Sequence, residues 1–217
     1  MTTSRKSPES PTERERKSWR LPVDLVQFLR AEARYYDVAV AHLVIRIFGA
    51  LETYYEQLPA SVQLLDKDRQ ALGLGRWPYL VHILEQRALA LKEQGEGFDA
   101  PEAISQARFR ARGRMSLERY DTGAKVLQSW YLPPHLLEVL RREADEMGWE
   151  QTPMAMALLN LYGGYFPLPE AAAAQLEADR WRLELARFEY LRHAFWRRFE
   201  AVKEKGPGFD RQRPKKT

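Results

Sequence analysis

The chain has 217 residues, of which 45% are hydrophobic and 29% charged, a balance typical of a folded protein rather than a disordered one. It contains no cysteine, which excludes disulfides, thiol nucleophiles and thiolate metal sites. The first residues lack the apolar core of a signal peptide and no run of about 18 apolar residues occurs, so we expect a cytoplasmic protein without a membrane span.

The sequence repeats itself at an ungapped shift of 111 residues. Residues 18–33 and 129–144 are identical at nine of sixteen positions. The same shift also superimposes scattered polar residues and a short final motif: Asp68 on Asp179, Tyr79 on Tyr190, His82 on His193, Arg87 on Arg198, and Gly97-Phe98-Asp99 on Gly208-Phe209-Asp210. We therefore divide the chain into a disordered N-terminal tail (1–15), a first repeat (16–99), a basic linker (100–125), a second repeat (126–210) and a basic C-terminal tail (211–217).

A short extended segment opens each repeat, at 16–21 and 126–132. Each segment runs into Leu-Pro, where the residue before proline favours extended backbone and the proline suits the first turn of a helix. Alternation along a strand predicts that Trp19, Leu21, Trp130 and Leu132 face the core. It predicts that the other residues of both segments, namely Arg16, Ser18, Arg20, Leu127, Ser129 and Tyr131, face outward.

Apolar residues at helical spacing predict a first helix over 23–36 and a second over 40–55, with counterparts in the second repeat. In the second helix of the second repeat, Thr152 resembles an N-cap, and Pro153 follows it in the first turn. Leu-Pro at 58–59 and 168–169 then breaks the chain before a third helix. A fourth helix begins near Trp77 after two glycines. The second repeat lacks glycine at that place, which allows its third and fourth helices to merge through Arg187.

The strand, the helix opened by Leu-Pro, the tight turn and the second amphipathic helix are similar to the ribbon-helix-helix family of bacterial DNA-binding proteins. The resemblance covers 16–57 and 127–166. It implies a mainly α fold in which two units pair their strands into an antiparallel ribbon that enters the major groove of DNA. Two copies in one chain form that pair internally, as a pseudo-dimer, or two chains pair as a homodimer.

The predicted DNA-binding residues face outward on the ribbon or lie in the linker: Arg16, Ser18, Arg20, Ser129, Tyr131, Arg108, Arg110, Arg112 and Arg114. An arginine fork can grip guanine or phosphate. The linker arginines alternate along the chain, and they either follow phosphates in a groove or form a solvated basic connection. Since Leu127 and Tyr131 replace polar side chains, we expect the first repeat to read more of the DNA than the second.

The repeated polar residues have simpler interpretations than catalysis. His82 and His193 recur without a nucleophile, carboxylate pair or metal-ligand set in both repeats, so we predict hydrogen-bonded packing histidines and no catalytic residue, metal or cofactor. Asp68 and Asp179 are expected either to pair with Arg87 or Arg198 or to cap a helix. Gly-Phe-Asp follows a helix in each repeat, which predicts a glycine cap and a phenylalanine folded back onto the helix.

Two functions follow from these patterns. The first is a DNA-binding, transcription-regulatory protein that contacts duplex DNA through the paired strands and the basic linker. The alternative is a protein-interaction or scaffold module of the same fold, which binds a partner through the additional helix pair of each repeat and does not bind DNA. An enzyme is not expected.

Overall fold

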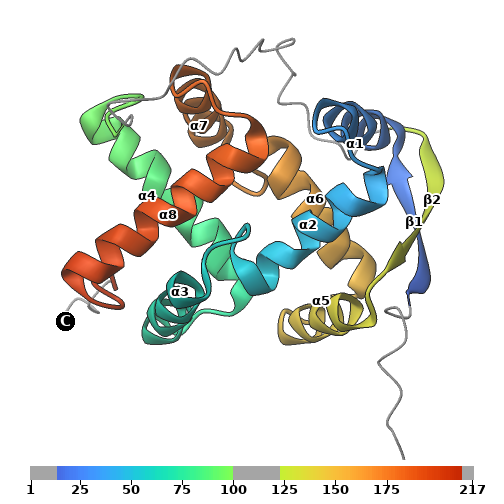
Figure 1. Cartoon of the computed structure of the whole chain (residues 1–217), viewed down its shortest axis with the longest axis horizontal. Helices are drawn as coiled ribbons and strands as arrows, with labels where there is room; N and C mark the ends of the chain where they lie inside the picture. The colour runs from blue at the N-terminus through green and yellow to red at the C-terminus, as the bar shows by residue number, and fades with distance from the viewer. Residues whose placement is uncertain (1–13, 100–122, 212–217) are drawn as a thin grey trace, which may run out of the picture.

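The computed structural model describes residues 14–99 and 123–211, which form two strands and eight helices (Figure 1). In chain order these are β1 (Glu15–Pro22), α1 (Val23–Tyr35), α2 (Val40–Thr53), α3 (Pro59–Leu72), α4 (Arg76–Gln94), β2 (Lys125–Leu132), α5 (Pro134–Glu146), α6 (Gln151–Gly164), α7 (Glu170–Arg182) and α8 (Arg187–Lys205). The prediction of a mainly helical chain with short strands is confirmed. The order of one strand and four helices occurs twice, and the bounds of α1, α2 and α4 recur 111 residues later in α5, α6 and α8.

The two strands pair with each other into an antiparallel ribbon at one end of the molecule (Figure 1). Ser18 lies opposite Ser129, and their Oγ atoms are 2.6 Å apart. The strand segments of the two repeats, distant in sequence, are therefore neighbours within one chain. The predicted alternation is confirmed on the inner side, where a set of large apolar side chains is buried: Trp19, Leu21, Trp130 and Leu132.

Proline at the end of each strand turns the chain directly into a helix. Pro22 has an extended backbone with φ −53° and ψ 140°, and α1 begins at the next residue. Proline cannot donate a backbone hydrogen bond, so it costs little at a strand end or a helix start. The buried face of α1 carries Leu25, Phe28, Leu29 and Ala33, as the spacing predicts. β1 thus runs directly into α1 and packs against it, while β2 packs against α2.

The helices of one half pack on those of the other. α4 lies against α7 and α3 lies against α8, while α2 contacts both α5 and α6. Figure 1 shows α2 and α6 in the middle of the molecule, between the ribbon and the crossing pair α4 and α8. One continuous hydrophobic cluster contains residues from both repeats, from Trp19 through Phe195. The repeats therefore share a core across the whole chain described by the structure.

The expectation that α7 and α8 can merge is wrong. α7 ends at Arg182 and α8 begins at Arg187, and between them Glu184 adopts a left-handed backbone with φ 53°. Arg180 donates from Nη1 to the carbonyl oxygen of Leu185 at 3.0 Å, and Leu183 is buried. These contacts hold the turn without the glycine that the first repeat has at the same place.

The predicted N-cap at Thr152 is also wrong. α6 begins at Gln151, with Glu150 at the N-cap position and no side-chain cap. Pro153 does lie in the first turn, where proline is tolerated because the first amides of a helix have no partner within it. The expected break at Leu58-Pro59 is confirmed, because α3 begins at Pro59. None of the helices in the described ranges is long and apolar enough to cross a membrane.

Candidate functional site

The outer face of the ribbon brings together the predicted strand residues. Arg16, Ser18 and Arg20 project from β1 and are exposed. The strand register sets Arg16 opposite Tyr131 and Arg20 opposite Leu127. Tyr131 and Leu127 have exposed fractions of 57% and 61%, which is high for side chains of this size. One face therefore combines a basic strip from β1 with an apolar strip from β2.

The charge of the ribbon is mainly positive. Its two strands carry Arg16, Lys17, Arg20 and Lys125, against a single carboxylate from Glu15. Among the residues that the structure describes, neither Arg16 nor Arg20 forms an ion pair. Their guanidinium groups therefore keep their donors available for a ligand in solvent. Arg108, Arg110, Arg112 and Arg114 lie outside the described residues.

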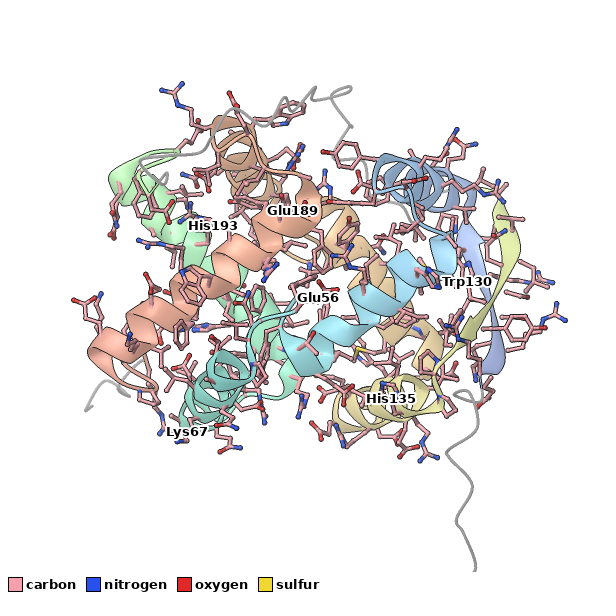
Figure 2. All side chains as sticks on the ribbon, viewed as in Figure 1. Glu56, Lys67, Trp130, His135, Glu189 and His193 are labelled. Carbon is pink, nitrogen blue, oxygen red and sulfur yellow. The ribbon has the colours of Figure 1, made fainter. Side chains whose placement is uncertain are left out.

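The two tryptophans of the ribbon pack inward. The rings of Trp19 and Trp130 lie 5.8 Å apart, and Trp19 also meets Phe48 of α2 edge to face at 5.8 Å. Trp19 has an exposed fraction of 2% and Trp130 of 7%. Figure 2 places Trp130 between the ribbon and α2. Packing rather than base stacking is thus their role in this structure.

The repeated polar residues join the halves through a network centred on Asp179. This fully buried carboxylate accepts hydrogen bonds from Arg87 Nη2 at 2.7 Å and from the backbone amide of Gly97 at 2.8 Å, both in the first repeat. It also accepts one from the Tyr190 hydroxyl at 2.7 Å. Arg87 in turn donates to Asp99 at 2.8 Å. Each donor compensates part of the cost of burying the charge.

A twin network is centred on Asp68 in the first repeat. Asp68 accepts from Arg198 Nε at 2.8 Å and from the Gly208 amide at 2.6 Å, both in the second repeat. The Tyr79 hydroxyl donates to it at 2.6 Å, and Arg198 also donates to Asp210 at 2.8 Å. The expected pairing of the aspartates with Arg87 and Arg198 is confirmed. Both pairs cross between the repeats, which the spacing did not reveal.

The two histidines lie at the edges of these networks. His82 Nε2 is 3.1 Å from Asp210 Oδ2, and His193 Nε2 is 3.3 Å from Asp99 Oδ2. Each contact again joins one repeat to the other. The hydrogen-bonded packing role predicted for His82 is therefore confirmed, and His193 has the equivalent place. In the described part of the chain, no group of three or more His, Asp or Glu side chains is arranged to hold a metal ion.

The Gly-Phe-Asp motif serves the same interface rather than a helix cap. The caps of α4 and α8 are Gly95 and Gly206, so the predicted cap at Gly97 and Gly208 is wrong by two positions. Gly97 has φ +69°, and a Cβ there would lie 2.7 Å from Arg182 Cγ. Glycine is needed because both the backbone and the close approach of α7 exclude a side chain. The phenylalanine does fold back: Phe98 packs against the guanidinium of Arg87 at 4.8 Å.

The networks predict how stability depends on pH. Burial alone would raise the pKa of Asp99, but the nearby His193 imidazole and the hydrogen-bonded Arg87 guanidinium outweigh it and hold that pKa below its usual range. The same balance applies to Asp210. Burial would raise its pKa, but the hydrogen-bonded Arg198 guanidinium lowers it below the usual range. A carboxylate of this kind contributes stability that is complete above its unfolded pKa of about 3.9 and is lost as the pH falls through the folded pKa. Glu143 opposes part of this, because burial raises its pKa.

We therefore expect the free energy of unfolding to fall steadily below about pH 4. Urea unfolding at a series of acidic pH values measures this dependence. The Asp210→Asn variant should lose part of the slope, since its amide does not titrate. A slope equal to that of the unmodified chain would show that Asp210 does not carry the effect.

Comparisons with known proteins give no relative for this chain: no protein-family model, curated protein or solved structure matches it.

Proposed function

We propose that the chain is a DNA-binding, transcription-regulatory protein of ribbon-helix-helix-like construction, with the β1–β2 ribbon as its reading element. The observation that carries the proposal is the antiparallel pairing of the two strands with Arg16 and Arg20 exposed on the outer face. A two-stranded ribbon fits the major groove, which is about 12 Å wide. A DNA-binding role is consistent with the cytoplasmic location that the sequence suggests.

The chemistry of the outer face supports this choice. Arginine forms bidentate hydrogen bonds with guanine and ion pairs with phosphate, and Ser18 and Ser129 add hydroxyl groups that accept or donate. Tyr131 and Leu127 offer apolar surface, which suits the methyl group of thymine better than a polar base edge. The buried Trp19 and Trp130 hold the strands from behind, so the outer side chains start from a fixed register.

Fluorescence anisotropy with a labelled pool of random-sequence duplexes, at several salt concentrations, tests the proposal. The unmodified chain should bind at low salt. The logarithm of its affinity should fall linearly with the logarithm of the salt concentration, because binding releases cations that are condensed on the phosphates. The Arg16→Ala/Arg20→Ala variant should bind at least about tenfold more weakly and show a smaller salt slope. Absence of binding by the unmodified chain even at low salt would overturn the proposal.

A matched variant separates the ribbon from net charge. Lys67→Ala/Lys203→Ala removes the same two positive charges from exposed positions on α3 and α8. Figure 2 shows Lys67 at the end of the molecule away from the ribbon. This variant should keep most of the affinity. Equal losses in both variants would mean that DNA is attracted by overall charge and not held by the ribbon.

A protein-interaction module is the second candidate, and the exposed apolar strip of Leu127 and Tyr131 favours it. The additional helices suit this role less than the sequence suggested, because α3 and α4 pack against α8 and α7 of the other half. Copurification of a stable protein partner that is lost in Leu127→Ser/Tyr131→Ser, but kept in Arg16→Ala/Arg20→Ala, would support this candidate over DNA binding.

A further inference from the structure

A cavity of about 610 Å³ that is open to solvent lies beside the His82–Asp210 contact, next to α4 and α7. α4 forms one wall with His82, Glu85, Ala88 and Lys92, and α7 contributes Ala172. Both apolar and charged side chains thus line a space of the size that small molecules occupy. The ribbon and the DNA proposal involve none of these residues.

The second repeat carries larger side chains at the equivalent positions of α8, where Trp196 is 37% exposed. The shift of 111 residues puts Trp196 at the position of Glu85, Arg197 at Gln86 and Phe199 at Ala88. The rings of Trp196 and Phe199 are 4.9 Å apart, and Phe199 packs against the hydrophobic core. Trp196 therefore stands where the first repeat has the carboxylate of Glu85, which lines the cavity, and Phe199 stands where it has the methyl group of Ala88.

The carboxylates of the two networks also differ, in the number of cations around them and in their exposure. Asp99 is approached by Arg87, by His193 and by Arg197, whose Nε lies 2.8 Å from Oδ2. Asp210 is approached by Arg198 and His82, and the third cation is replaced by Gln86. The side chain of Asp99 has an exposed fraction of 2%, whereas that of Asp210 has 14%. One side of Asp210 thus faces the cavity, where its twin is covered by an arginine.

We propose that this cavity binds a small molecule that carries an aromatic ring and a positively charged amine or guanidinium. The ring takes the place that the Trp196 side chain takes in the other repeat, against the exposed Leu89 and the apolar Leu72 and Leu74 that line the same space. The cation approaches Asp210 as Arg197 approaches Asp99, with Glu85 as a second carboxylate in the wall. Lys92 and Arg211 also line the cavity, so the position of the ligand cation beside Asp210 and Glu85 decides binding, and not the summed charge of the lining.

Isothermal titration of the full chain with tryptamine, a ring with one amine, tests the site. We expect saturable binding of one molecule per chain. Indole-3-acetate, which has the same ring and a negative charge, should bind at least about tenfold more weakly, because with the ring in the same place its carboxylate would lie beside Asp210 and Glu85. Absence of saturable tryptamine binding, or equal binding of both compounds, would overturn the proposal.

Exchanging residues between the repeats supplies the matched variants. Glu85→Trp/Gln86→Arg/Ala88→Phe gives the first repeat the side chains of the second and should abolish tryptamine binding. The single change Gln86→Arg, which puts a guanidinium next to Asp210 with little added volume, should weaken it at least about tenfold and guards against misfolding of the triple variant.

The reverse exchange, Trp196→Glu/Arg197→Gln/Phe199→Ala, should raise the stoichiometry from one site to two. Unchanged binding in the Gln86→Arg variant would contradict the proposed position of the cation. DNA binding is measured separately through the ribbon, so failure of this site leaves that proposal untouched.

Discussion

Asp179→Ala should lower the free energy of unfolding by about 3–5 kcal/mol, because it leaves the buried Arg87 guanidinium with one carboxylate instead of two. The same change removes the acceptor of the Tyr190 hydroxyl and of the Gly97 amide. Burial raises the pKa of Tyr190, so its hydroxyl stays a donor that needs a partner. Urea unfolding followed by circular dichroism measures the loss.

The twin position gives an internal comparison. Asp68→Ala should cost a similar amount, since Asp68 makes the corresponding contacts to Arg198, Tyr79 and Gly208. Asp145→Ala, at an exposed position on α5, should change stability by no more than about 0.5 kcal/mol. A small effect at both buried aspartates would mean that the networks orient the side chains but contribute little to the free energy of unfolding.

Trp19→Ala should lower the free energy of unfolding by about 3–5 kcal/mol, the usual cost of removing a large buried aromatic side chain. Trp19 joins the ribbon to the helices, because its ring contacts Trp130 on β2 and Phe48 on α2. The ribbon should therefore loosen as well, and the DNA affinity that we propose should fall even where the protein remains folded. Thermal unfolding and anisotropy on the same preparation measure both effects.

The outer face of the ribbon supplies the control for this change. Tyr131→Ala also removes a large aromatic ring from the ribbon, but from a side chain that is more than half exposed. It should change the free energy of unfolding by only about 0.5 kcal/mol. Comparable losses from Trp19→Ala and Tyr131→Ala would show that the ribbon is not held by its inner face.

The helices and strands could be predicted well from the sequence, because each pattern of apolar residues occurs twice, once in each repeat. Leu-Pro marks the start of the first helix of each half, and the buried spacing of Leu25, Phe28 and Leu29 follows the helical period. Alternation placed Trp19 inward and Arg16 outward, since side chains along a strand point to opposite sides. Local periodicity was sufficient for these features.

Sequence reasoning missed the partners across the two halves. Asp68 and Arg198 are 130 residues apart, and no local pattern distinguishes a pair within one repeat from a pair between repeats. A signal did exist: scattered polar residues were identical at the shift of 111 although their helical neighbours differed. The turn at Glu184 was missed for another reason, because the contacts of Arg180 impose a left-handed backbone on a residue that does not favour it.

The unlike outer strips of the ribbon have a consequence for the DNA target that we propose. A symmetric homodimer presents two identical faces and therefore suits a palindromic site with equal half-sites. Joining both halves in one chain lets Arg16 and Arg20 stand against Tyr131 and Leu127, so that each strand is free to carry its own chemistry. A site recognised by such a ribbon need not be a palindrome: one half would be selected by hydrogen bonding, and the other by thymine methyl groups or by shape.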